Sequence, residues 1–296
     1  MSDQVTASEP EVFLYEGGEV AYGLRRSLTR VRVGPQVTEI PEGAFWGCDK
    51  LIELQLNEGL KVIGERAFQR CRSLRSVTLP SSVTELGSFA FADCSGLFKL
   101  QLNEGLKVIG FEAFSECTAL RSVTIPSSVT KWGSRAFYGC IGLDELKLKD
   151  GLQVIGECAF LRTSLRSVTL PPSVTELGND SFLDCDKLVE LQLEEGLKVI
   201  GNGAFEDCTS LRDITIPSSV IKWGWRAFAG CIGLIELQLK EGLRIIGEGA
   251  FQDCKALRNV TLPSSVSELH SRAFANCRNL AELHLSKRLR FVAAKS

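Results

Sequence analysis

The sequence predicts a solenoid of twelve stacked repeats spanning residues 28–296, each repeat contributing a short strand to a parallel β-sheet. Two observations carry this prediction: a phenylalanine recurs at almost constant spacing, and an apolar pattern typical of a strand keeps a constant distance from it. A single repeat is too short to bury its own apolar side chains. Stacked repeats bury them against one another, so we expect one continuous core.

The phenylalanine column sets the repeat length. Nine of its ten intervals are 23 residues and one, from Phe160 to Phe182, is 22. The column consists of Phe45, Phe68, Phe91, Phe114, Phe137, Phe160, Phe182, Phe205, Phe228, Phe251 and Phe274. Chance does not produce this regularity.

Ten of the eleven cysteines stand three residues after a column phenylalanine. The unit of Phe160 lacks this cysteine and is one residue short. Free cysteine behaves as a small buried hydrophobe, and no Cys-x-x-Cys pair is present, so we predict a reduced core ladder and no metal or cofactor. A disulfide between adjacent repeats remains conceivable. Cys158 lies outside the ladder and is the best candidate for an exposed, reactive thiol.

Each repeat predicts the same local structures in the same order. Leu74, Val77 and Leu79 end in a period-two alternation, which is typical of a short strand with one face buried. Pro-Ser-Ser or Asn-Glu-Gly follows as a turn. A second short strand over 83–86 ends at Gly87, where we expect positive φ. The Ala-Phe-x-x-Cys run is expected to form a helical turn.

The two ends of the array differ from its middle. Twelve strands are expected, from the unit at Leu28 to a truncated last unit at Leu280. Residues 1–27 are predicted to form an N-terminal cap, with an extra strand over 12–15. The array stops within a unit, which leaves self-association through the C-terminal end as a possibility. Between the ends, two unit types alternate with a period of about 46 residues.

Composition excludes several partners and locations. Lys and Arg number 34 against 36 Asp and Glu, so nothing favours nucleic acid. The sequence contains no run of 18 consecutive apolar residues, so membrane insertion is not expected. The polar, acidic start of the sequence lacks the pattern of a signal peptide, which predicts a cytoplasmic location, or the cell surface if a leader has been removed.

The unit C-x-x-L-x-x-V-T-[LI]-P-S-S-V-T-x-[LW]-G-x-x-A-F resembles the BspA-like class of leucine-rich repeats. Residues 15–20 and 37–41 are similar to the versions found in unicellular algae. The resemblance implies an α/β leucine-rich-repeat solenoid that is right-handed and curved, and a role in binding or adhesion. The ninth position departs from the commonest leucine-rich pattern, because it holds Gly59 or Ser82 in place of Asn or Cys.

Departures from the repeat point to a protein-binding surface. Exposed apolar residues in columns that are otherwise polar indicate a contact with a partner protein, and packing against neighbouring side chains of the same chain is the alternative. The candidates are Phe89, Phe98, Phe111, Tyr138, Ile141, Trp225 and Ile232, with Trp46 as an isolated further case. The outward face of the sheet is polar and mildly acidic. An arginine column beside it, which includes Arg75 and Arg121, is expected to pair with glutamates of neighbouring repeats.

The predicted function is therefore a non-enzymatic protein-binding scaffold or adaptor. Neither histidine, His270 or His284, has a nearby nucleophile with a plausible partner, so no catalytic residue is expected. A cell-surface adhesion protein is the alternative, which glycosylation at Asn179 or Asn259 would favour.

Overall fold

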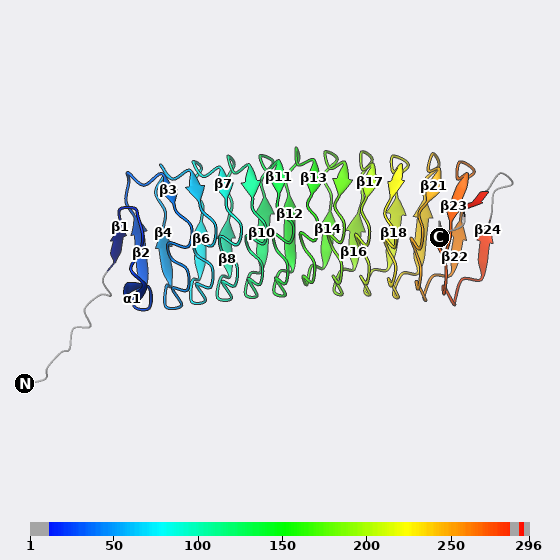
Figure 1. The fold of residues 1–296 in the computed structure, drawn as a ribbon. Coiled ribbons are helices and arrows are strands. Elements are labelled where there is room, and N and C mark those ends of the chain that lie inside the picture. Colours follow the sequence, from blue (N-terminus) through cyan, green and yellow to red (C-terminus); the bar gives the residue numbers. More distant parts are fainter. Residues whose placement is uncertain (1–11, 285–289, 293–296) are drawn as a thin grey trace, which may run out of the picture.

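The computed structural model describes residues 12–284 and 290–292. Parts of the predicted N-terminal cap and of the truncated last unit lie outside these residues. Within them the chain forms a parallel β-solenoid whose rungs stack along one axis, from β1 at the N-terminal end to β24 at the other (Figure 1).

The first sheet runs along one side of the stack and contains the twelve predicted strands plus the extra strand expected over 12–15. Its strands are β1 (Phe13–Tyr15), β2 (Arg30–Val33), β4 (Glu53–Gln55), β6 (Ser76–Thr78), β8 (Lys99–Gln101), β10 (Ser122–Ile125), β12 (Glu145–Leu148), β14 (Ser167–Thr169), β16 (Glu190–Gln192), β18 (Asp213–Ile216), β20 (Glu236–Leu239), β22 (Asn259–Thr261) and β24 (Glu282–His284). All pairings are parallel and in register, as in Val77 beside Leu100.

The second sheet is built from shorter strands on another side of each rung. They are β3 (Glu39–Ile40), β5 (Val62–Ile63), β7 (Glu85–Leu86), β9 (Val108–Ile109), β11 (Lys131–Trp132), β13 (Val154–Ile155), β15 (Glu176–Leu177), β17 (Val199–Ile200), β19 (Lys222–Trp223), β21 (Ile245–Ile246), β23 (Glu268–His270) and β25 (Arg290–Val292). The one helix in the described residues is α1 (Tyr22–Arg25), near the N-terminal end.

The third side of each rung, which we call the turn face, consists of the seven residues centred on the column phenylalanine. The expected helical turn is reduced here to single turns, such as the bond from Cys71 N to Phe68 O. Within each turn, alternate backbone N–H groups donate to the next rung instead, as Phe68 N does to Ala90 O at 2.8 Å. Two positions per rung, such as Arg66 and Arg70, take positive φ to allow this.

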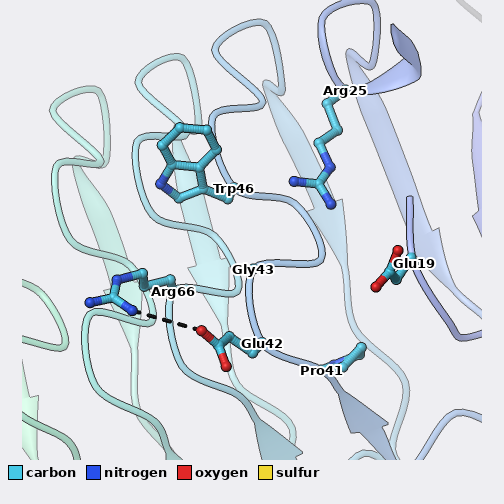
Figure 2. Close-up of a pocket in the computed structure, with 7 residues that line it drawn as sticks. All are labelled: Glu19, Arg25, Pro41, Glu42, Gly43, Trp46 and Arg66. Carbon is cyan, nitrogen blue, oxygen red and sulfur yellow. Dashed lines mark ion pairs between the residues drawn. The ribbon is translucent and has the colours of Figure 1, made fainter. Parts of the chain in front are cut away.

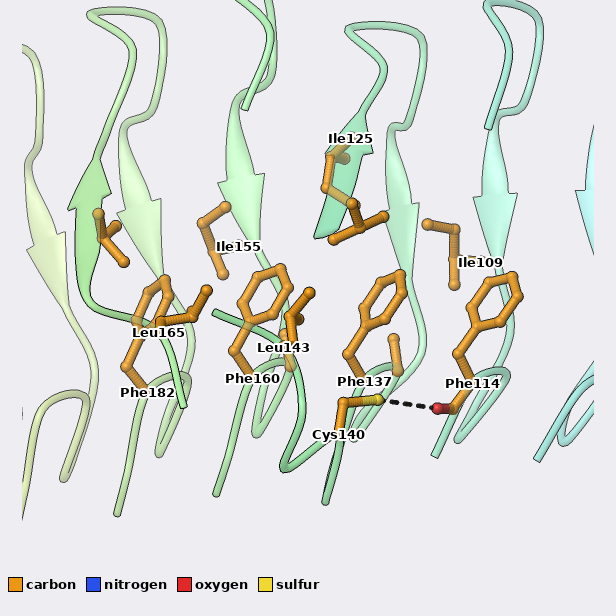
Figure 3. Close-up of a cluster of buried hydrophobic side chains, with 14 of the residues drawn as sticks. Ile109, Phe114, Ile125, Phe137, Cys140, Leu143, Ile155, Phe160, Leu165 and Phe182 are labelled. Carbon is orange, nitrogen blue, oxygen red and sulfur yellow. Dashed lines mark hydrogen bonds between the residues drawn. The ribbon is translucent and has the colours of Figure 1, made fainter. Parts of the chain in front are cut away.

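The core is a stack of phenylalanine rings along the axis (Figure 3). Adjacent rings from Phe45 to Phe274 lie nearly parallel, with centroids 5.0–5.5 Å apart. Tyr15 covers the first ring edge-on, and its hydroxyl donates to Gly18 O. Because every ring but the terminal ones has a copy on each side, the stack excludes water along the described rungs.

The cysteine ladder runs beside the rings, as predicted. Each thiol from Cys71 onward donates to the carbonyl oxygen of the phenylalanine one rung before its own, at 3.1–3.4 Å. Figure 3 shows this contact between Cys140 and Phe114. In the short rung Thr163 takes the cysteine's place, and its hydroxyl donates to Phe160 O. All eleven cysteines are free.

The glycine that ends the second short strand has a different role from the one expected. Gly87 and Gly110 do not adopt positive φ, so that prediction is wrong. A Cβ atom on Gly110 would instead lie 2.5 Å from the carbonyl carbon of Gly87 and 2.6 Å from Ser88 N. The glycine is required because the backbones of adjacent rungs approach one another too closely for a side chain.

Two unit types alternate because their turns are complementary. Ser128 Oγ donates to Leu106 O of the preceding rung and accepts from Gly105 N, and the same pair of bonds recurs at Ser173, Ser219 and Ser265. This serine occupies the ninth position of the repeat, where the commonest leucine-rich pattern has asparagine. In alternate rungs its hydroxyl satisfies backbone groups of the preceding rung. The first sheet follows the same period, with breaks after β4, β8, β12 and β16.

The second sheet breaks after β11 and after β19, each of which ends in a tryptophan. Trp132 and Trp223 turn their rings inward, edge-on to Phe160 and Phe251. A Cβ atom added to Gly156 would lie 2.6 Å from the Cβ atom of Trp132, and one added to Gly247 would lie 2.5 Å from that of Trp223. Each tryptophan therefore displaces the next strand and interrupts the ladder.

Substitution of Gly110 by alanine should destabilise the fold, because the added methyl group meets the backbone of the preceding rung. We expect the free energy of unfolding to fall by about 1–3 kcal/mol. Gly23→Ala is the control, since nothing lies within 4 Å of its added Cβ atom. Equal stability of the two variants in urea denaturation would contradict the close-approach explanation.

The thiols offer a second test. Burial raises the pKa of Cys94 and of Cys140 to about 12, and the thiolate is the reactive form. We expect at most the two ladder ends, Cys48 and Cys277, to react with a thiol reagent in native buffer, and all eleven in denaturant. Fast reaction of more than two thiols in the folded protein would refute the buried ladder.

Candidate protein-binding surface

The seven candidate residues fall on two corners of the rung and on the turn face between them. Phe111 and Trp225 stand two residues after β9 and β19, at the corner between the second sheet and the turn face. Phe98 directly precedes β8, at the corner between the turn face and the first sheet. Ile141 and Ile232 lie next to that second corner, four residues after their column phenylalanines. The predicted cluster is therefore not one patch.

Phe89 and Phe111 form the one ring contact within the candidate set among the described residues. Their centroids lie 5.2 Å apart in an edge-to-face arrangement across neighbouring rungs. The guanidinium of Arg66 lies over the Phe89 ring at 5.1 Å. Phe89 is half-buried and adopts positive φ, a conformation that is uncommon for a bulky residue.

Arginines also cover the other turn-face aromatics. Arg135 lies over Tyr138 at 5.8 Å and Arg226 over Trp225 at 5.2 Å. Trp46, the isolated case, has Arg70 over its ring. These contacts favour local packing for part of the candidate set. In the sequence, an arginine one rung or a few residues away from an aromatic residue would have indicated this packing.

Phe98, Ile141 and Ile232 have no such covering. They are 51%, 60% and 44% exposed, respectively, and no aromatic or cation contact reaches them within the described part of the chain. All three lie beside the first sheet. Within the candidate set, the uncovered apolar residues are therefore on the first-sheet side of the rung.

The first sheet presents a polar outward face, as expected. Thr169 donates to Gln192, and Thr215 donates to Gln238, between adjacent rungs. The expected pairing of the arginine column is wrong: among the described residues Arg75, Arg121, Arg166, Arg212 and Arg258 form no ion pair within 4.0 Å. The register explains this, because the arginines precede the strands and the glutamates lie within them.

An open recess of about 540 Å³ lies near the N-terminal end (Figure 2). It is lined by Glu19, Arg25, Pro41, Glu42, Gly43, Trp46 and Arg66. Arg66 and Glu42 face each other across 3.7 Å at its floor, and no set of polar groups converges on its centre. The recess shows the charge pairing of the turn face and defines no ligand.

Cys158 is not the exposed thiol that its position predicted. Its side chain is buried, and desolvation raises its pKa, with the carboxylates of Asp180 and Glu157 adding to the effect. No group of three metal-ligating side chains occurs in the described ranges. His270 stands in β23, 3.8 Å from Glu268, and the side chain of His284 lies outside the described residues.

A carboxylate cluster occupies the C-terminal half of the turn face. Burial, followed by the charges of Glu206 and Asp184, raises the pKa of Asp207. Burial also raises the pKa of Asp180, with Glu206 next in effect. Arg226 pairs with Glu206 and partly compensates the cluster.

A model of the BspA-type leucine-rich repeat region, in six copies, matches residues 18–144, 130–237 and 178–296. A solved leucine-rich repeat protein from Bacteroides ovatus ATCC 8483 is 26% identical, with a TM-score of 0.76, over 96% of this chain and 83% of that one. A leucine-rich cell surface protein from Faecalibacterium prausnitzii A2-165 is 24% identical, with a TM-score of 0.53, over 90% and 87%, and shares the fold. No curated protein matches. No helix in the described ranges is long and apolar enough to cross a membrane.

The raised pKa of Asp207 predicts a pH-dependent effect of its removal. A carboxyl whose folded pKa lies above its unfolded value of about 3.9 destabilises the fold when ionised, and the cost vanishes below that value. Asp207→Asn should therefore raise the melting temperature at pH 7 and leave it unchanged near pH 3. Asparagine also tolerates the positive φ at this position.

Asp184→Asn is the matched control. Asp184 occupies the same column and also has positive φ, but it pairs with Arg162 at 3.3 Å. Its neutralisation removes an ion pair together with one of the charges that act on Asp207, so any gain at pH 7 should be smaller than that of Asp207→Asn. The absence of a gain in Asp207→Asn would argue against the repulsion within the cluster.

Proposed function

Since the chain belongs to the BspA-type leucine-rich-repeat family, we propose that it is a non-enzymatic scaffold or adaptor, acting in the cytoplasm, that binds another protein through its extended repeat surface. The bare apolar residues Phe98 and Ile141 carry this proposal. Ile141 interrupts a column that is otherwise mostly polar, Phe98 is the one aromatic residue in its column, and both lie on the first-sheet side. Exposed apolar groups that gather on one side of a polar surface often mark an interface.

The stacked rungs support the proposal physically. Every rung of a solenoid contacts only its neighbours, so surface residues can vary without changing the core. The phenylalanine ladder holds the rungs rigid, and a preorganised surface loses little entropy on binding. No convergent set of catalytic groups accompanies these surface residues, which favours binding over catalysis.

The seven candidate residues divide into two proposed roles. Phe98, Ile141 and Ile232 would contact the partner directly, because nothing covers them. Phe89, Phe111, Tyr138 and Trp225 would form a second contact area on the turn face, where arginines accompany three of them. Aromatic residues and arginines together are the residues most enriched at interface hot spots.

The double variant Phe98→Glu, Ile141→Glu should weaken partner capture by about tenfold or more, because it places charge in an apolar contact. Ile221→Glu is the control, since Ile221 is 66% exposed and lies outside the candidate set, next to the second sheet. Affinity capture from the native source, quantified by mass spectrometry, measures the effect. Unchanged capture by the double variant would rule out this surface.

A cell-surface adhesion protein is the second candidate. Asn259 is exposed in β22 and begins an Asn-Val-Thr sequon. In the other sequon, the hydroxyl of Ser181 is buried. Occupied glycans on protein from the native source, found by mass spectrometry, would favour adhesion at the cell surface over the cytoplasmic scaffold.

A further inference from the structure

A row of arginines follows the first sheet along its edge. Its members, which we call the arginine row, directly precede β6, β10, β14, β18 and β22. They are Arg75, Arg121, Arg166, Arg212 and Arg258. All five are exposed, and each lies two rungs from the next. The row therefore presents five guanidinium groups along one edge of the first sheet.

The arginine row differs from the arginines of the turn face. There, Arg70 pairs with Asp93, Arg135 with Glu112, and Arg226 with Glu206. The five arginines of the row have neither an ion pair nor a side-chain hydrogen bond within the described residues. Their planar donors are free for a partner, although the chain holds enough carboxylates to pair all of them.

The rungs between the arginines place apolar side chains in the same column. Phe98 and Val189 occupy it and are 51% and 42% exposed, and Ile235 is half-buried there. Ile52, which is 43% exposed, continues the column before the first arginine of the row. Asp144 is the exception in the middle of the row. Cationic and apolar groups thus alternate rung by rung, which suits a partner with both carboxylates and apolar side chains.

The spacing of the row limits the shape of this partner. Two strand spacings are about 9.6 Å. A polyproline-type segment rises about 3.1 Å per residue and makes a turn every three residues, so one of its faces recurs about every 9.3 Å. A carboxylate at every third residue of such a segment would meet each arginine in turn. A β-strand would turn every second such carboxylate to its opposite face.

We infer that the arginine row binds an extended acidic segment of a partner protein, with a carboxylate at every third residue and apolar side chains between. Arginine suits this role, since its fork binds a carboxylate through two hydrogen bonds. Glutamates within the strands, such as Glu53 and Glu190, lie one residue beyond this column. They disfavour a uniformly charged polyanion such as a sulfated polysaccharide. The inference rests on the proposed protein-binding function and names its partner's chemistry.

The test uses a fluorescent twelve-residue peptide of four Glu-Pro-Leu units, whose binding to the full chain is followed by anisotropy. Replacing all five arginines of the row with glutamine should weaken binding by about tenfold or more at moderate salt. The matched control replaces with glutamine five exposed lysines that lie in strands of the second sheet or directly before them, which are Lys61, Lys107, Lys131, Lys198 and Lys222. It removes the same charge from another side and should leave binding unchanged.

Three outcomes would overturn the inference. The first is the absence of measurable binding, and the second is an equal loss in the two variants, which would indicate non-specific attraction. The third is binding of equal strength by a peptide of the same composition with its glutamates adjacent, or by heparin, because neither has the required spacing. These three outcomes leave the proposed protein-binding function intact, because capture of the partner by the arginine variant is measured separately.

Discussion

The distance between successive rungs is the constraint on which the rest of the structure depends. Parallel strands in register set it at about 4.8 Å, and the turn face keeps it through bonds such as Phe68 N to Ala90 O. At this distance each side chain meets its own counterpart in the next rung. Aromatic rings can stack at such a spacing, small thiols can reach a carbonyl of the preceding rung, and a glycine must stand where two backbones almost touch. The residue type of each of these columns is therefore determined by the spacing between rungs.

Most of the fold could be predicted from the sequence because this constraint acts on every rung alike. The intervals of the phenylalanine column gave the number of strands, and the period-two pattern located them. What escaped prediction depends on contacts between rungs. The glycine at 87 looks like a turn residue within its own repeat, and only the neighbouring backbone shows why it must lack a side chain. The exposure predicted for Cys158 failed for the same reason, since a position outside the ladder is still covered by adjacent rungs.

The exposure of several candidate residues was predictable from the sequence, and their arrangement on the rungs was not. The departures from the repeat identified exposed residues such as Phe98 and Ile141 correctly, and exposure follows from column position. A linear sequence does not say which side of a rung a column occupies, so residues on two corners looked like one cluster. The coverage of Tyr138 by Arg135 also depends on side-chain direction, which the repeat pattern does not encode. The predicted ion pairs of the arginine column do not form, because the arginines directly precede the strands whereas the glutamates lie within them.

The complementary turns of alternate rungs set the increment by which such a chain can lengthen. Glu104 contacts Ser127 one rung further on and Lys149 two rungs further on, and Glu195 repeats both contacts with Ser218 and Lys240. Inserting one rung would place two like turns together and separate each glutamate from its lysine. Inserting two rungs would preserve the alternation of the turns and add about 10 Å of length. Inserting four rungs, the interval from Glu104 to Glu195, would also preserve the glutamate–lysine contact and add about 19 Å. Gene duplication could therefore extend the reach of this molecule in blocks of rungs, with its cross-section unchanged.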